Sequence, residues 1–198
     1  KAYQSLILLP YLMSWVIVSY LAYTFLSAET GMFNKSILEP LGLEAVNWYQ
    51  EKKYWPFILI FVSVWKSVGY SMIIYLSSVV GISADYFEAA KIDGASKWQQ
   101  IKYITLPLLK PVITILLIMA VGGIFKSDFG LFFQLPKDSG PLYPVTNVLD
   151  TYIFRALKTN GEIGMSSAAA LFQSTVGFIM IMGANKLVSK IDNENALF

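Results

Sequence analysis

Long apolar runs alternate with polar segments along the chain, and this alternation predicts helices that cross a membrane. Crossing a hydrocarbon core about 30 Å thick takes about 20 residues at a rise of about 1.5 Å per residue, and four runs reach or approach that length. Soluble helices rarely stay apolar for so long, which argues against a large soluble core. We therefore expect an all-α fold, with spans at Leu6–Leu26, Pro56–Gly81, Leu108–Phe125 and Met165–Val188.

Prolines and small residues indicate how these spans are built. Pro10 lies near the start of the first span, where a missing amide hydrogen costs little. In the fourth span Ser166, Ala170 and Ser174 follow one another at helical spacing, with Gly177 beyond them. Such a face lets two helix backbones approach closely in lipid, so it predicts a helix neighbour and not a ligand.

Two polar segments between the spans, Ser27–Trp55 and Ser127–Gly164, contain the prolines and glycines of extramembrane loops. Four spans place both loops on one side of the membrane, with Ile82–Pro107 and the tail Ser189–Phe198 on the other side. Basic residues are denser on the side of Ile82–Pro107, so the positive-inside rule favours that side as cytoplasmic. We treat residues 1–198 as one transmembrane domain.

Composition supports a membrane protein and excludes several functions. Hydrophobic residues make up 56% of the 198 positions and the mean hydropathy is +0.55, whereas soluble domains are about 45–50% apolar. The net charge of +2 is too small to indicate a nucleic-acid partner. Cysteine and histidine are absent, so we expect no metal site and no catalytic residue. The chain begins at Lys1 without a signal-peptide pattern, and we read it as a fragment.

Residues 83–107, which we call the knob, have the pattern of two short helices joined by a turn. Asp85 suits the first turn of a helix, and Gly94 suits the residue that ends it. Ser96 with Gln99 forms a capping-box pattern for a second helix, which we expect Pro107 to close. Two amphipathic helices of this kind fit a socket on another protein.

The knob resembles the EAA loop of ABC importer permeases. The matching positions are Glu88, Ala89, Ala90, Gly94, Ile104, Leu106 and Pro107, with Asp93 directly before the glycine. The flanking chain, including Tyr11–Leu26, Val148–Tyr152 and the closing Ala196–Phe198, is similar to the maltose-type carbohydrate-uptake permeases, above all to their polysaccharide branch. The resemblance covers essentially the whole chain.

This resemblance implies a type I ABC importer permease fold, a polytopic transmembrane helical bundle with a cytoplasmic two-helix coupling loop. In that family the loop docks into clefts of the ATP-binding subunits, so Glu88 would form an ion pair with the ATPase and Gly94 would permit the sharp turn. Such permeases have more helices than the spans found here, so we expect the first helices to be absent.

The resemblance also implies the partners. They are a second homologous permease, two ATP-binding cassette subunits, an extracellular or periplasmic solute-binding protein, a saccharide and the lipid of a bacterial plasma membrane. The sequence has no Gly-rich phosphate-binding loop of the ATPase type. We therefore expect no enzyme activity and no cofactor in this chain, with ATP and Mg bound by the partner ATPase.

One polar stripe interrupts the second span. Ser63, Lys66, Ser67 and Tyr70 recur at helical spacing on one face of an otherwise apolar helix. A lysine near mid-membrane is costly unless it reaches an interface, a partner or a water-filled cavity. We therefore predict that the stripe lines the substrate pathway, where hydroxyl groups and aromatic faces suit saccharides. The alternative is that these polar groups join neighbouring helices.

The substrate and the transport class stay open. Lys66 and Lys126 fit an acidic saccharide such as a uronate oligomer, whereas Asp128 beside Lys126 is typical of a solvated rim. The loop with Gly140 and Pro141 resembles the segment that reaches toward the external binding protein. An importer of a non-sugar solute would share the EAA loop, and a secondary carrier or channel would not need it. A membrane enzyme would lack an evident acid, base or nucleophile.

Overall fold

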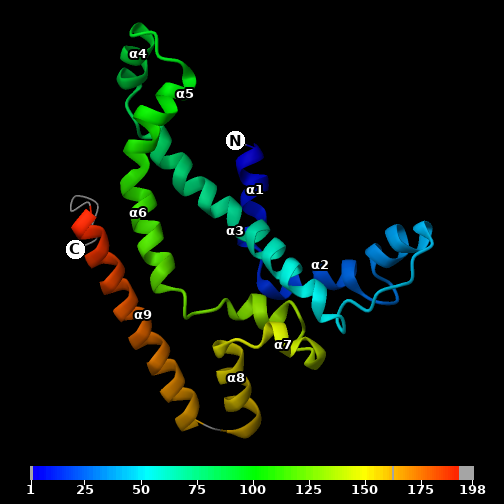
Figure 1. Ribbon diagram of the computed structural model, residues 1–198. Coiled ribbons are helices and arrows are strands. Elements are labelled where there is room, and N and C mark those ends of the chain that lie inside the picture. Colours follow the sequence, from blue (N-terminus) through cyan, green and yellow to red (C-terminus); the bar gives the residue numbers. More distant parts are fainter. Residues whose placement is uncertain (1, 162, 192–198) are drawn as a thin grey trace. The chain divides into compact units, whose positions relative to one another are not determined.

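The computed structural model describes residues 2–161 and 163–191, and its regular structure is helical throughout that part (Figure 1). The longer helices are α1 (Ala2–Leu12), α2 (Trp15–Leu26), α3 (Trp55–Val80), α6 (Leu106–Gly122), α8 (Leu149–Asn160) and α9 (Ile163–Ile191). The shorter ones are α4 (Ala84–Ile92), α5 (Lys97–Gln100) and α7 (Tyr143–Thr146). Single π-helical turns lie at Asn34–Leu38, Ile101–Thr105 and Gly130–Gln134, and 3-10 turns at Glu39–Leu41, Lys52–Tyr54 and Gly140–Leu142. The all-α prediction is confirmed.

Three helical stretches are long and apolar enough to cross a membrane: Lys52–Val80, Lys97–Gly122 and Ile163–Lys190. They overlap the last three predicted spans: the second ends one residue before Gly81 and the third ends at Gly122 instead of Phe125, while the fourth includes all of Met165–Val188. Each begins or ends in charged residues that belong at the interface, because a lysine side chain can extend from a helix end toward water.

The first predicted span, 6–26, is not one continuous helix but a bent pair of helices. The helices Tyr3–Leu12 and Trp15–Leu26 meet at an angle of 97°. Ser14 has extended backbone between them, and its hydroxyl oxygen accepts a hydrogen bond from the Ile17 N–H at 3.3 Å. A serine in this position starts a new helix in a new direction. Pro10 therefore lies in the last turn of α1 and does not open a span.

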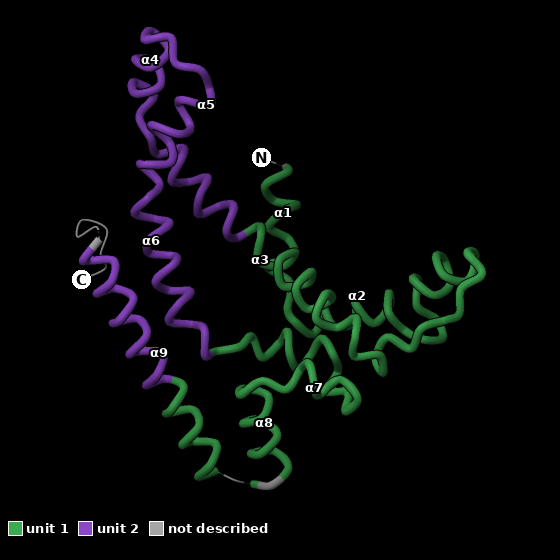
Figure 2. The backbone as a smooth tube through the Cα atoms, in the orientation of Figure 1, with its two compact units in different colours: residues 1–69, 126–173 green, residues 70–125, 174–198 purple. Residues whose placement is uncertain are grey.

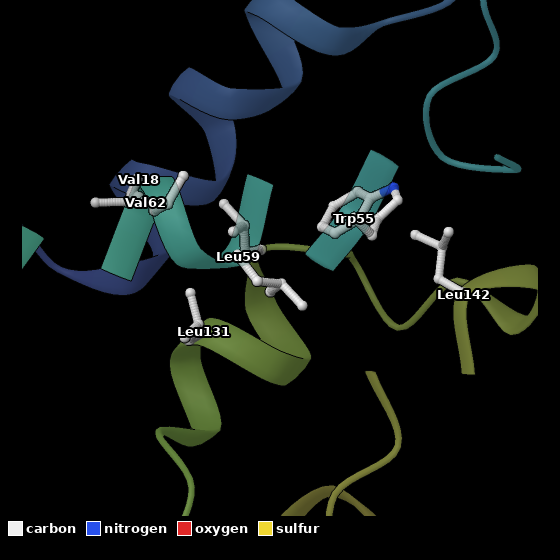
Figure 3. Packing of buried hydrophobic residues seen from close by; sticks show 7 residues of the cluster. Val18, Trp55, Leu59, Val62, Leu131 and Leu142 are labelled. Atoms are coloured by element: carbon white, nitrogen blue, oxygen red, sulfur yellow. The ribbon is translucent and has the colours of Figure 1, made fainter. Parts of the chain in front are cut away.

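Tertiary contacts divide the chain into two compact units (Figure 2). The first unit comprises Lys1–Gly69 with Lys126–Gln173, and the second comprises Tyr70–Phe125 with Ser174–Phe198. The first unit has an apolar core in which α2, α3 and the chain after Gly130 pack together (Figure 3). The buried members of this core are Val18, Trp55, Leu59, Val62, Leu131, Leu135 and Leu142.

Within the first unit, the predicted loop after α2 is folded around the side chain of Asn34, which is only 2% exposed. Its Nδ2 donates to the carbonyls of Ala28 at 3.0 Å and Val46 at 2.9 Å. Its Oδ1 accepts hydrogen bonds from the Val46 N–H at 3.2 Å and from the indole N–H of Trp48 at 3.0 Å. One amide side chain thus satisfies backbone groups that would otherwise be buried without partners.

Within the second unit, α9 packs closely on α6. A Cβ atom placed on Gly177 would lie 3.0 Å from the Gly122 carbonyl oxygen, and one placed on Gly122 would lie 2.1 Å from Cγ1 of Ile181. Both glycines are buried. The absence of side chains at these two positions is what allows the backbones to approach, as the small-residue pattern of α9 predicted.

The packed face of α9 differs in part from the predicted one. Ser166 is buried and its hydroxyl donates to the Ile153 carbonyl at 3.3 Å, but Ala170 and Ser174 are exposed. The buried positions continue instead through Gln173. A step of four residues turns about 40° beyond a full helical turn, whereas a step of seven returns to within about 20° of the same face. Repeated steps of four therefore leave the packed face.

Candidate functional site

The knob begins and ends its first helix as its sequence predicts. Ser83 precedes α4, and its hydroxyl oxygen accepts a hydrogen bond from the Asp85 N–H at 3.3 Å. At the other end Gly94 has φ +75°, in the left-handed region that glycine adopts without steric cost. The Gly94 N–H donates to the Lys91 carbonyl at 3.1 Å, and the Ala95 N–H donates to the Ala90 carbonyl at 2.9 Å. This pair of bonds is a Schellman C-cap.

The second helix of the knob also starts as predicted but does not stop where predicted. The Ser96 N–H donates to Oε1 of Gln99 at 2.7 Å, and the Gln99 N–H donates to the Ser96 hydroxyl at 3.4 Å, which confirms the capping box. Pro107 does not close the helix, because helical structure runs unbroken from Lys97 to Gly122. The Leu106 N–H donates to the carbonyl of Ile101, five residues back, so a π-helical turn precedes the proline.

The functional positions proposed for the knob are open to solvent in this chain. Glu88, Ala89, Asp93 and Gly94 are all exposed, and Ala90 is half-buried. Glu88 and Asp93 form no ion pair within the described residues. At the far end of the segment, Ile104 is half-buried, while Leu106 and Pro107 are exposed.

Apolar side chains are exposed beside these polar ones. Ile92 is 87% exposed and Trp98 is 80% exposed, and neither α4 nor α5 contains a buried residue. Large apolar groups on a short surface helix are characteristic of a surface that a partner covers.

The polar stripe of α3 does not act as one group. The Lys66 ammonium donates to the carbonyl oxygens of Pro10 at 3.2 Å, Tyr11 at 2.9 Å and Met13 at 2.7 Å. It also lies 5.1 Å from the ring centroid of Trp15, within cation–π range. The cost of a lysine in an apolar helix is therefore offset by a partner that the sequence pattern did not identify, the broken end of α1.

The hydroxyl groups of the stripe have different surroundings. The Ser67 hydroxyl donates to the Ser63 carbonyl one turn earlier, at 2.8 Å, so this donor is satisfied within α3. Ser63 is half-buried, Ser67 is exposed and Tyr70 is 47% exposed on the same helix. Ser63, Ser67 and Tyr70 remain candidates for a pathway lining, because hydroxyl oxygens can still accept hydrogen bonds from a sugar.

Asp128, which the sequence indicated as part of a solvated rim, makes specific contacts. Its Oδ2 accepts a hydrogen bond from the indole N–H of Trp15 at 3.0 Å, and its Oδ1 accepts from the N–H groups of Gly130 at 2.9 Å and Leu131 at 3.3 Å. Trp15 and Asp128 lie 113 positions apart in the sequence, so no local pattern could have joined them. Lys126 is exposed.

Arg155 organises the turn at Gly140–Pro141. Its guanidinium donates to Oδ1 of Asp138 at 2.7 Å and to Oδ1 of Asn147 at 2.8 Å, and it lies 4.2 Å from the ring centroid of Tyr143. These contacts attach both sides of the turn to α8, and a planar guanidinium suits several fixed acceptors at once.

Asp150, at the start of α8, connects three segments of the first unit. Its Oδ2 accepts hydrogen bonds from the Ser127 N–H at 2.8 Å, from the Ser127 hydroxyl at 2.5 Å and from Nε2 of Gln173 at 3.0 Å. Burial raises the pKa of this carboxyl, but the hydrogen bonds from Ser127 and Gln173 together lower it further, and the pKa lies below its ordinary value.

Apolar helices of spanning length, joined by an exposed helical knob, are typical of a multi-pass membrane protein. The chain belongs to the family of binding-protein-dependent transport system inner membrane components, which it matches over residues 2–190. The family assignment made from the EAA-like pattern is confirmed.

Similar proteins that are named as permeases of sugar transport systems support the same family. The chain is 34% identical over 194 residues to the polygalacturonan/rhamnogalacturonan transport system permease protein YteP of Bacillus subtilis (strain 168). This match covers 98% of this chain and 60% of that protein. It is 31% identical over 155 residues to the lactose transport system permease protein LacF of Rhizobium radiobacter, and this match covers 77% of this chain and 51% of that protein. The chain thus spans about 60% or less of the length of these relatives.

The fold is shared with a solved transporter. A chain of the bacterial alginate ABC transporter, crystallised with an alginate pentasaccharide-bound periplasmic protein, superposes with a TM-score of 0.86 at 33% sequence identity. The match covers 96% of this chain and 65% of that chain. A second crystal structure, of an ABC transporter that imports the acidic polysaccharide alginate, gives a TM-score of 0.87 at 33% identity over 97% of this chain and 66% of that chain. The type I importer permease fold is confirmed.

Proposed function

We propose that this chain belongs to a permease subunit that forms half of the translocation pathway of a bacterial binding-protein-dependent importer for oligosaccharides, including acidic ones. The observation that carries the proposal is the family match over residues 2–190. The substrate class is supported by the names of two similar systems, which transport polygalacturonan and alginate. A lactose permease among the relatives leaves neutral sugars as the competing substrate class.

We further propose that the knob docks on an ATP-binding subunit, which supplies the hydrolysis that this chain lacks. Glu88 and Asp93 offer exposed carboxylates, and Ile92 and Trp98 offer exposed apolar surface beside them. A surface with an apolar centre and charged neighbours is typical of protein interfaces. Two ATP-binding subunits, a second permease and an external solute-binding protein complete the proposed assembly in the plasma membrane, with ATP and Mg bound outside this chain.

The helix that follows the turn supports a mechanical role for the knob. Helical structure is continuous from Lys97 to Gly122, so a displacement of α5 is transmitted along one element and not absorbed at a flexible joint. Closure of the ATP-binding subunits would move this helix, and the permease would alternate between inward-open and outward-open states. Ser63, Ser67 and Tyr70 are the proposed sugar-facing positions, whereas the Lys66 ammonium is bonded to backbone carbonyls at the end of α1.

Transport assays on the reconstituted importer test the substrate and the energy source together. We expect uptake of oligogalacturonate to need both ATP and the external binding protein, and to exceed uptake of a neutral malto-oligosaccharide of equal length. Equal uptake of both sugars would reject the acidic specificity. Uptake without ATP would instead indicate a carrier or channel.

A charge reversal tests the docking of the knob. Glu88→Lys should lower the amount of ATP-binding subunit that copurifies with the permease, because it replaces an attractive contact by a repulsive one. Glu44→Lys is the matched control, because Glu44 is equally an exposed glutamate but lies in the loop after α2. Equal copurification of both variants would contradict the docking role.

A further inference from the structure

The break between α1 and α2 leaves backbone groups without helical partners in an apolar part of the chain. The last carbonyls of any α-helix have no partner within it, and within a membrane such groups need a partner from elsewhere in the protein. Here the partner is Lys66, whose ammonium reaches the carbonyls of Pro10, Tyr11 and Met13 at 2.7–3.2 Å. Three acceptors use all three protons of the ammonium group, and a cation at a helix C-terminus is favoured by the helix dipole.

A second contact between α3 and α1 lies close to the same break. Gly69 lies one turn after Lys66, and a Cβ placed on it would lie 2.1 Å from the Ile7 carbonyl oxygen and 2.9 Å from Cα of Leu8. The backbone of α1 therefore lies directly against α3 at a place that only glycine permits. Lys66 and Gly69 together fix both the end and the middle of α1.

A third contact holds the other side of the break. The ring of Trp15, the first residue of α2, lies against Gly130, where an added Cβ would be 2.0 Å from its Cδ1 atom. The indole N–H of Trp15 donates to Asp128, and Lys66 lies over the indole ring. The break is thus held by Lys66 and Gly69 of α3 on one side and by residues 128–130 on the other, and these contacts all lie within the first unit.

From these contacts we infer that Lys66 is a positioning residue, which fixes the α1–α2 break to α3 so that the three helical segments move as one body during transport. Its protons are used by backbone carbonyls, so it does not hydrogen-bond the saccharide. The inference depends on the proposed function only for its transport readout, since the clamp itself is a property of this chain.

The absence of cysteine makes the clamp directly measurable. Ser19 lies in α2 just beyond the break and is 5% exposed, so Ser19→Cys places a buried thiol there, the single one among residues 1–198. In membranes that contain the assembled transporter, this thiol should react slowly with N-ethylmaleimide. Adding Lys66→Met should raise the labelling rate several-fold, and Lys66→Arg, which keeps a cationic donor, should restore part of the protection. Lys53→Met, at an exposed lysine that lies over the neighbouring Tyr54 ring, should leave the rate unchanged.

Transport by the same variants separates positioning from substrate binding. Lys66→Met should lower the maximal rate by the same factor for acidic and neutral oligosaccharides, with KM unchanged. A loss confined to acidic sugars through a raised KM, or a Ser19→Cys labelling rate that Lys66→Met and Lys66→Arg both leave unchanged, would overturn the inference. If the unaltered transporter imports no saccharide, the proposed function fails, while the labelling rate still decides whether Lys66 clamps the break.

Discussion

Gly94→Ala is a perturbation whose size follows from the backbone of the knob. Gly94 has φ +75°, and a Cβ added there would meet no atom within 4 Å. The substitution therefore introduces backbone strain and no steric clash. An L-residue in the left-handed region costs about 1–2 kcal/mol. That cost changes a local equilibrium by a factor of roughly 5 to 30.

This strain falls on the turn that joins α4 to α5. The Schellman bonds of Ala95 and Gly94 depend on the left-handed conformation, so Ala at position 94 should raise the fraction of molecules in which the turn is open. If the knob transmits the force of ATP hydrolysis, the number of sugar molecules imported per ATP should fall by a factor of that order. Membrane insertion and the melting temperature should change little, because neither α4 nor α5 contains a buried residue.

The chain offers two controls with the same backbone strain. Gly42 has φ +71° and Gly161 has φ +66°, and an added Cβ would meet nothing within 4 Å at either position. Uptake and ATP hydrolysis are measured in proteoliposomes for Gly42→Ala, Gly94→Ala and Gly161→Ala. Only Gly94→Ala should lower the ratio of uptake to hydrolysis, and Gly94→Pro should lower it further because proline fixes φ near −65°. An equal fall in all three alanine variants, or normal coupling in Gly94→Ala, would falsify the coupling role.

Three other predictions concern stability. Gly69→Ala should destabilise the purified protein by about 1–3 kcal/mol, because its Cβ would overlap the Ile7 carbonyl oxygen. Gly183→Ala should be tolerated, because a Cβ there would meet no atom within 4 Å. Thermal melts of the two variants in detergent measure the difference. Asn34→Ala should cost about 1–3 kcal/mol for each buried group left unpaired, measured in the same way, and an unchanged melt would show that water replaces the amide. Asp150 has a lowered pKa in the folded state, so its contribution to stability is complete above its unfolded pKa of about 3.9 and is lost as the pH falls through the lower folded value. When the pH is lowered below about 4, the melting temperature of Asp150→Asn should therefore fall less than that of the unaltered protein. An equal fall in both proteins would contradict the role of the Asp150 carboxylate.

The parts of the structure that sequence predicts well are those fixed by near neighbours. Three of the four predicted apolar runs form helices of spanning length, because an apolar run of about 20 residues is by itself long enough to cross a membrane. The turn at Gly94 and the capping box of Ser96 with Gln99 are likewise local, because each bond joins residues three to five positions apart. Pro107 misled the prediction because the π-helical turn before it accommodates a proline that would otherwise end the helix.

The break after α1 could not be predicted in the same way. Ser14 is a good helix N-cap, but serine also occurs within membrane helices, and Pro10 is compatible with a continuous span. What stabilises the break is Lys66, which lies 53 to 56 positions away from its three acceptors, together with Asp128 and Gly130. The stripe of α3 singled out Lys66 as a lysine that needs a partner, but the identity of that partner depends on tertiary structure.

Charged groups in this chain consequently have two distinct uses. Lys66, Asp128 and Arg155 each form hydrogen bonds between segments of the first unit that lie far apart in the sequence, so each stabilises the packing of those segments. Glu88 and Asp93 are exposed and form no ion pair within the part of the chain that the structure describes. Charges that hold a helix bundle together are costly to remove, whereas unpaired surface charges cost little within the chain and serve recognition. Substitutions at Lys66, Asp128 and Arg155 should therefore lower stability together with transport. Substitutions at Glu88 and Asp93 should alter assembly with the ATP-binding subunit while stability is kept.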